Sequence, residues 1–472
     1  MIRSTKRLTA GALCAGMLSG AFLWSAAARA DIPLADPAKT NGWEVTTNGR
    51  VNAYLSWVFG ETMNANNLGN LVDPSNPMGT ERYTYVGPQV FIQGNPVPAG
   101  AVADQTNDTK LSSPRIRGGF ASTILAFNIY KQISEDLKLT VKQAFWAGIQ
   151  NGIKSGYRAY NDTANVDWRE QWMELSGSWG AAWGGRRVGL YNRGGMRMNW
   201  LLMHQHGVGH PCNVDSGGTA TCGHTGVGSM FPNRHAQLGY ATPDLAGLQL
   251  SIDMADPAMI DANWNRTPLP RFEAELTYKK GFGGTDELNA WANGLTQPVG
   301  RTTDLPPGQP GQPPGGIPAD ATRNVYGVGG GAWGRFSGFA LGGTGWWGKG
   351  LGTATAFGSD GGGPNDRNTA IDDAGTLRTH FGYLAIANLR LGDLELAASY
   401  GSTNCRETAW DRDPENGRHI TVIKEVRGIG GKVAYHVGPV TFSVDGMNLN
   451  HHWHRGEKQV ANVVSAGMLG EW

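Results

Sequence analysis

The sequence predicts an all-β protein, an antiparallel transmembrane β-barrel of about sixteen strands in which one loop folds inward as a constriction loop. Charged residues make up 17% of the chain, against roughly 25% in ordinary globular proteins. Segments of about ten residues alternate apolar with polar side chains, as the strands of membrane barrels do. The last segment places Val464, Ala466 and Met468 on one face and stops on Trp472. An aromatic residue at the end of a closing strand sits at the membrane–water boundary in such barrels.

Residues 1–30 have the pattern of a secretory signal peptide. Basic side chains come first, an apolar stretch covers residues 8–24, and the small-residue triplet Ala28-Arg29-Ala30 precedes Asp31. We expect this segment to be cleaved on export. Residues 31–42 are then a short N-terminal lead-in, and residues 43–472 form the barrel.

Predicted strands follow one another as hairpins. In the first strand, Val51, Leu55 and Trp57 alternate with polar residues. Lys138 and Lys142 share a face of a later strand, and each would cost about 2–4 kcal/mol in lipid near the bilayer midplane, so that face is expected to line a wet interior. The remaining strands are expected at about 115–132, 137–147, 168–177, 181–190, 234–242, 247–254, 272–278, 288–292, 325–334, 339–347, 381–388, 394–400, 420–435, 440–447 and 458–472.

Long loops alternate with short turns along the chain, which predicts a barrel with one elaborate rim and one plain rim. The long loops are expected at residues 60–114, 192–233, 296–321, 352–377 and 404–418. Residues 306–318 are rich in proline and glycine, and a linker between domains is the alternative there. The same strand pattern continues on both sides, which favours a loop.

Two stretches resemble motifs of the general diffusion porins of Gram-negative bacteria. In the first, strand 169–174 enters Leu175-Ser176-Gly177-Ser178-Trp179-Gly180 and leads to Gly185-Arg186. The second, residues 238–248, is similar to that family's Tyr-x-Ser-Pro-x-Phe-x-Gly turn, with Thr242 in place of Ser. The family's inward-folded third loop lies between these motifs, where residues 192–233 lie here. The resemblance implies a homotrimer in the outer membrane, with Trp472 as part of the signal read by the barrel-assembly machinery.

The field at the narrowest point decides what passes through such a pore. In the family, basic wall residues face acids on the third loop. Asp215 is the only acid between residues 192 and 233, so we expect a weak preference for anions or neutral solutes. Wall carboxylates at Glu170, Glu174, Glu273 and Glu275 could restore neutrality. The candidate basic residues are Arg115, Arg117, Lys142, Arg169, Arg186 and Arg187 on strands, with Arg193 and Arg197 at the start of the loop. For each arginine the alternative is a rim charge in solvent.

Cysteine and histidine residues of the same loop give two further expectations. Cys212 and Cys222 are close in sequence, and an oxidising compartment makes them the expected disulfide; Cys405 is then left over as a loop thiol. His204, His206, His210 and His224 lack the rigid spacing of a metal centre. We interpret them as polar loop residues that gain charge near pH 6–7, and expect no metal and no cofactor.

Tryptophans allow two interpretations. Those at expected strand ends suit an interfacial girdle: Trp43, Trp57, Trp179, Trp333 and Trp472. Alternatively, Trp146 and Trp291, with Trp346 or Trp347, could form a slide on which sugars stack.

The sequence therefore predicts an outer-membrane porin for passive diffusion of small hydrophilic solutes and ions. Its expected partners are outer-membrane lipid and two further copies of the chain. A substrate-selective channel for anions or sugars is the alternative within the same fold, and a secreted Trp-rich carbohydrate-binding β-protein is the alternative outside it. No basic excess points to nucleic acid. Neither Gly-x-Ser-x-Gly nor His-Glu-x-x-His occurs, so we do not expect an enzyme.

Overall fold

The computed structural model describes residues 31–35, 37–61, 110–121, 123–149, 166–203, 223–260, 263–307, 313–354, 370–413, 423–454 and 458–472. Expectations that fall elsewhere lie outside the described residues. These include the signal peptide, the pair Cys212–Cys222, Asp215, and the three histidines His204, His206 and His210.

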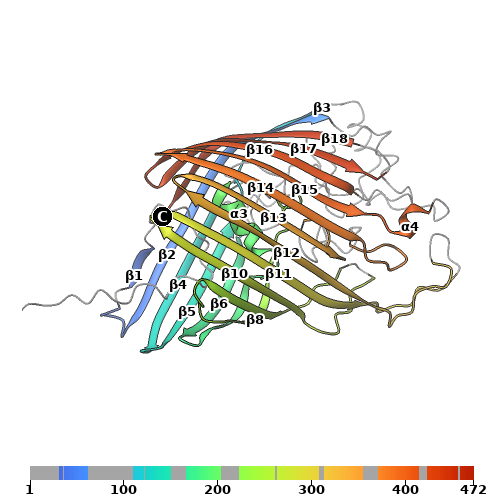
Figure 1. The fold of residues 1–472 in the computed structure, drawn as a ribbon, viewed down its shortest axis with the longest axis horizontal. Helices are drawn as coiled ribbons and strands as arrows, with labels where there is room; N and C mark the ends of the chain where they lie inside the picture. The colour runs from blue at the N-terminus through green and yellow to red at the C-terminus, as the bar shows by residue number, and fades with distance from the viewer. Residues whose placement is uncertain are drawn as a thin grey trace, which may run out of the picture.

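One closed antiparallel sheet forms the molecule (Figure 1). The strands are β1 (Ile32–Ala35), β2 (Trp43–Glu61), β3 (Lys110–Arg117), β4 (Thr123–Ser134), β5 (Leu137–Ala147), β6 (Val166–Gly177), β7 (Gly180–Val188), β8 (Arg234–Ala241), β9 (Leu248–Ala255), β10 (Arg271–Gly283), β11 (Asp286–Gly300), β12 (Thr322–Phe336), β13 (Phe339–Lys349), β14 (Thr379–Leu391), β15 (Leu394–Arg406), β16 (Ile423–Val437), β17 (Val440–Trp453) and β18 (Lys458–Glu471).

The barrel has sixteen strands, because β3 and β4 pair with successive parts of β2 and act as one strand, while β1 is a short addition. Strand β18 pairs with β2, and this pairing closes the sheet. The predicted antiparallel β-barrel of about sixteen strands is confirmed.

Side chains alternate between two environments along the strands. In β2, Val51, Leu55 and Trp57 are 46%, 57% and 51% exposed, while Asn52 and Ser56 are buried. The same alternation gives an exposed apolar face on other strands, for example Leu341 and Trp347 on β13. In a closed barrel the exposed apolar face is the exterior, and it suits contact with lipid. A secreted soluble protein would not carry such a surface.

Short turns join the hairpins where the sequence predicts them. Residues 135–136 turn between β4 and β5, and Ser178 and Trp179 turn between β6 and β7. The carboxylate of Asp136 accepts hydrogen bonds from the backbone N–H and the hydroxyl of Ser178, both at 2.7 Å. These bonds join two neighbouring turns at the plain rim and lower the pKa of Asp136.

Helix α3 (Arg193–Leu202) lies within the barrel, among the strands in Figure 1. It belongs to the segment between β7 and β8, residues 189–233, which we call the α3 loop. Buried Met198 and Leu202 pack against the inner side of β12–β15, on Trp333, Ala340, Leu384, Ile386 and Ala397. At Gly194, an added Cβ would lie 2.3 Å from the ring of Trp291, so only glycine allows the helix to come this close to the wall.

The sequence did not predict this helix, since Gly194 and Gly195 disfavour helix formation. A second, single-turn helix, α4 (Ala409–Arg412), follows β15. Neither α3 nor α4 is long and apolar enough to cross a membrane, and the described residues contain no other helix that could.

Several strand boundaries and side-chain orientations differ from the predictions. The strand expected at 115–132 is interrupted after Arg117, where the backbone N–H of Gly119 donates to the Asn52 side chain at 2.8 Å. Strand β15 continues to Arg406, so buried Cys405 lies on a strand and not in a loop. Trp333 is buried against α3 and is not an interfacial residue. Trp43, Trp57 and Trp179 are exposed, as the girdle interpretation requires.

The lead-in at residues 31–42 also has more structure than expected. Strand β1 pairs with β2 around Val45 and Thr47. The carboxylate of Asp31 accepts hydrogen bonds from Thr46 at 2.8 Å and Asn48 at 2.7 Å. These bonds hold the lead-in against the barrel wall.

Candidate functional site

Strand β10 anchors the start of the α3 loop. One oxygen of Glu273 accepts hydrogen bonds from the backbone N–H groups of Leu190 at 2.6 Å and Tyr191 at 2.9 Å. Two residues further along β10, Glu275 binds the guanidinium of Arg193, the first residue of α3, with Nε–Oε2 at 2.8 Å. Both carboxylates are buried. Acids of the wall therefore hold a basic loop, the reverse of the arrangement that the resemblance implies.

The other two glutamates that the sequence suggested as wall carboxylates, Glu170 and Glu174, are paired as well. Glu170 on β6 lies 3.2 Å from Lys142 and 3.3 Å from Arg234. Glu174 binds Arg187 at 2.8 Å. The inner wall is thus rich in charge, but many of its charges neutralise one another.

Aromatic rings pack against three arginines of this wall. The guanidinium of Arg187 stacks on Trp172 and Trp183, 4.6 and 4.7 Å from their ring centres. Trp146 has the guanidinium groups of Arg169 and Arg234 at 4.6 and 4.5 Å from its ring centre. Such stacking stabilises a desolvated guanidinium by about 2 kcal/mol.

Of the four tryptophans proposed for a sugar slide, Trp146, Trp346 and Trp347 are engaged elsewhere. Trp146 is covered by guanidinium groups, and the indole N–H of buried Trp346 donates to the carbonyl of Gly228 at 3.1 Å. Trp347 lies on the exposed apolar exterior. Trp291 contacts α3 at Gly194.

His224 fixes the end of the α3 loop. Its Nδ1 lies 2.8 Å from the side-chain oxygen of Asn199 on α3, and its Nε2 lies 2.7 Å from the hydroxyl of Ser399 on β15. Complete burial lowers the pKa of His224 to about 3. The expectation that this histidine gains charge near pH 6–7 is therefore wrong, because burial disfavours the imidazolium.

A cavity of about 560 Å³ lies between α3 and the plain rim. Three acids line it, and each has a basic partner: Glu275 binds Arg193, Glu287 lies 3.6 Å from Arg335, and Glu395 binds Lys432 at 2.7 Å. The cavity also contains Arg197, Lys279 and Arg390. Among the described residues, none of these three cations has an acid within salt-bridge distance. The cavity therefore carries an excess of positive charge.

The remaining predicted pore residues take different positions. Arg115 and Arg117 lie on β3, in register with Ser56 and Tyr54 of β2, and their side chains are outside the described residues. Arg187 is buried on the inner wall, whereas neighbouring Arg186 is exposed and lies opposite exposed Ala236.

Trp472 completes the sheet. It exchanges two backbone hydrogen bonds with Gly49 of β2, at 3.1 and 2.9 Å. An added Cβ at Gly49 would lie 2.4 Å from the Trp472 ring. The absence of a side chain at Gly49 therefore leaves the space that the aromatic ring occupies.

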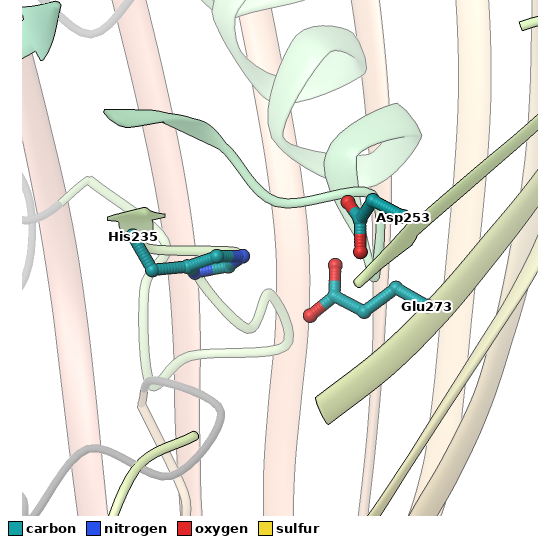
Figure 2. Close-up of side chains that lie close together, drawn as sticks. All are labelled: His235, Asp253 and Glu273. Atoms are coloured by element: carbon teal, nitrogen blue, oxygen red, sulfur yellow. The ribbon is translucent and has the colours of Figure 1, made fainter. Parts of the chain in front are cut away.

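One cluster was not found from the sequence. His235 on β8, Asp253 on β9 and Glu273 on β10 bring possible ligand atoms within 4.8 Å of one another (Figure 2). Alternation was the signal that could have found it, because Ser251 and Asp253 alternate with Leu250, Ile252 and Met254. An acid at an inward-facing position of a barrel strand is a candidate ligand for an ion in the lumen.

Sequence comparison found no matching family model and no similar curated protein. Solved structures do share the fold. The outer membrane channel DcaP of Acinetobacter baumannii is 12% identical, with a TM-score of 0.57 over 92% of this chain and 98% of that one. An anion-selective porin from Comamonas acidovorans is also 12% identical, with a TM-score of 0.53 over 91% of this chain and 100% of that one. The fold is that of the outer-membrane porins of Gram-negative bacteria.

Proposed function

We propose that the chain forms a water-filled pore for passive diffusion of small hydrophilic solutes and ions across a Gram-negative outer membrane. One observation carries the proposal: a closed barrel with an apolar exterior encloses a charged inner wall and an inserted helix. Diffusion needs no nucleophile or cofactor, so the proposed function is not enzymatic. Export with cleavage of residues 1–30 and assembly as a homotrimer belong to the same proposal.

In this proposal, residues 192–233 form the constriction loop. Three anchors support that role: Glu275 binds Arg193, Glu273 binds the backbone before α3, and His224 joins α3 to β15. A loop fixed at both ends can hold a constant pore width.

The proposed selectivity is a weak preference for anions or neutral solutes. Arg197, Lys279 and Arg390 in the cavity have no acid within salt-bridge distance in the described part of the chain. Their charge supports this preference, because a low-dielectric wall strengthens the field of uncompensated charge. The similar fold of a porin described as anion-selective agrees with this direction. Lys142, Arg187 and Arg193 each have a wall glutamate as partner, and the Nε of Arg169 lies 2.6 Å from a carboxylate oxygen of Asp167. These four residues are proposed to line the pore with most of their charge offset.

Reversal potentials in a salt gradient test this proposal on detergent-purified protein in planar bilayers. Wild-type channels are expected to favour chloride over potassium. Arg197→Gln and Arg390→Gln are each expected to move the reversal potential toward zero. Lys458→Gln, on an exposed position of β18, is the control and should leave it unchanged. Unchanged selectivity in both cavity variants would contradict the assignment of the cavity to the ion path.

A substrate-selective channel is the second candidate. The cavity volume lies within the range of small-molecule sites, about 300–1,000 Å³. Its wall includes Trp291 and Trp333 beside Asn289 and Asn388. Conductance that saturates with one class of solute, and block of the current by that solute, would favour this candidate over general diffusion.

A further inference from the structure

We propose that His235, Asp253 and Glu273 form a binding site for a divalent transition-metal ion of the zinc type at the base of the α3 loop. The site lies where β8, β9 and β10 meet the long-loop end of the barrel. This inference goes beyond the pore function and does not depend on it.

The sheet places two carboxylates face to face. Asp253 of β9 and Glu273 of β10 are directly opposite in the antiparallel register, and both point to the inner side. Like charges at directly opposite positions destabilise a sheet unless a cation lies between them. Figure 2 shows the two carboxylates side by side, with the ring of His235 directed toward them.

Glu273 already has cationic and N–H partners. Arg271 lies 3.1 Å from one of its oxygens, and two backbone N–H groups of the α3 loop donate to the other. Since each carboxylate oxygen has two lone pairs, the oxygen near Arg271 retains one for a metal ion.

Asp253 has neither a salt bridge nor a hydrogen bond of this kind among the described residues. It is 4% exposed, and neither of its oxygens accepts a hydrogen bond from the described residues. A buried carboxylate without a partner is costly. With Arg271 assigned to Glu273, one negative charge of the cluster remains, and it is located on Asp253.

His235 selects the class of ion. An imidazole nitrogen with two carboxylate oxygens suits Zn²⁺ and related transition metals, whereas Ca²⁺ and Mg²⁺ prefer oxygen ligands alone. Around a tetrahedral zinc ion with bonds of about 2.0 Å, ligand atoms lie about 3.3 Å apart. The present separations, up to 4.8 Å, require a small inward movement of the side chains.

Binding also requires a change at Arg271. Its guanidinium contacts both ring nitrogens of His235, with Nη2–Nε2 at 2.9 Å. The metal ion would displace Arg271 from the imidazole while its contact with Glu273 remains. Because Gly189 of the α3 loop adjoins both His235 and Glu273, the bound ion would join three strands to the start of that loop.

Equilibrium dialysis against Zn²⁺ tests the site on the full barrel in detergent. His204, His206 and His210 are first replaced by alanine, so that they do not contribute a second site. This background is expected to bind one Zn²⁺ per chain, and Co²⁺ in its place should give a visible absorption band typical of four-coordinate cobalt.

Asp253→Asn and His235→Ala are each expected to weaken Zn²⁺ binding at least 10-fold. Asp445→Asn removes another buried carboxylate from the inner wall, on β17, and should bind like the background. Because Asp253→Asn removes a repulsion, its barrel should fold at least as well, as measured by circular dichroism and by resistance to urea.

Two results would overturn the proposal. One is equal Zn²⁺ affinity with and without Asp253. The other is absence of stoichiometric Zn²⁺ together with an infrared band of a protonated carboxyl group that disappears in Asp253→Asn, which would show that a shared proton neutralises the pair. Neither result involves conductance, so the pore proposal stands or falls separately.

Discussion

Two parts of the inner wall hold the same loop by different physical means. On β10, one ion pair and two N–H bonds fix the start of the loop, with Arg193–Glu275 as the contact to α3 itself. On β12–β15, the same helix rests on apolar side chains, with Met198 and Leu202 buried. Directional bonds determine where the helix begins, while apolar contacts determine how closely it approaches the wall.

The comparison predicts that the charged side responds more strongly to single substitutions. Removing one partner leaves a buried charge uncompensated, whereas removing apolar atoms loses only the burial and leaves a cavity. Three substitutions and one change of pH test this contrast, in decreasing order of expected effect.

Glu275→Gln should have the largest effect. It leaves the buried guanidinium of Arg193 without its counter-ion, at an expected cost of about 3–5 kcal/mol. Amide hydrogen exchange of α3 in the folded barrel measures the free energy of opening. The double variant Arg193→Met with Glu275→Leu should recover most of the loss, because both charges are removed together. No recovery would mean that the ion pair is not the anchor.

Leu202→Ala tests the apolar side. The side chain is fully buried, and its truncation should lower the free energy that holds α3 on the wall by about 2–5 kcal/mol, at the lower end if the site collapses. The same exchange measurement applies. Leu201→Ala, at the half-buried neighbour, should cost less. Equal losses would show that α3 does not face β12–β15 through Leu202.

Acidification should loosen the loop through His224. Its pKa is about 3 in the folded protein and about 6.5 when unfolded. The stabilisation of the loop by neutral His224 is therefore complete above pH 6.5 and declines as the pH falls toward 3. At pH 5 the expected loss is about 2 kcal/mol. Exchange of the α3 amides at pH 7 and pH 5, corrected for the intrinsic rate, measures it. His224→Gln should remove this pH dependence; its persistence would assign the effect to other groups.

Adjacent glycines on β13 give the smallest and most local test. An added Cβ at Gly342 would lie 2.6 Å from Trp333 and 2.8 Å from Met198, whereas at Gly343 the nearest atom is 3.8 Å away. Gly342→Ala should destabilise the position of α3 by about 1–3 kcal/mol, and Gly343→Ala should change it little. Resistance to urea, monitored by tryptophan fluorescence, compares the pair. Equal effects of the two substitutions would show that α3 does not pack against β13 at Gly342.

The alternation of polar and apolar residues made the barrel predictable. It did not predict which charged side chains pair with one another. The inward positions of Lys142, Glu170 and Glu174 follow from a period of two. Which charge each one meets does not, since Arg193 and Glu275 are 82 positions apart. Helix α3 was missed because two glycines in its first turn hide the helical pattern of the apolar residues after them.

Trp333 and His224 show a second kind of error. Trp333 was assigned to the interface from its place near a strand end, although its odd number on β12 puts it on the side opposite exposed Val328. The sequence around His224 predicts a solvated loop residue, because the strands that bury this histidine are distant in sequence and no neighbouring residue indicates the burial. Both residues contact the α3 loop or belong to it, so the local sequence was least informative where the tertiary contacts of that loop decide the structure.

The pairing of β18 with β2 has a consequence for folding. The exchange of hydrogen bonds between Gly49 and Trp472 joins the first and last strands of the barrel. Until that contact forms, β2 and β18 both present open edges, which can pair with other chains. Contacts of such long sequence separation form slowly. Barrel closure is thus a late step, and the nascent chain needs protection from aggregation until its last strand is in place.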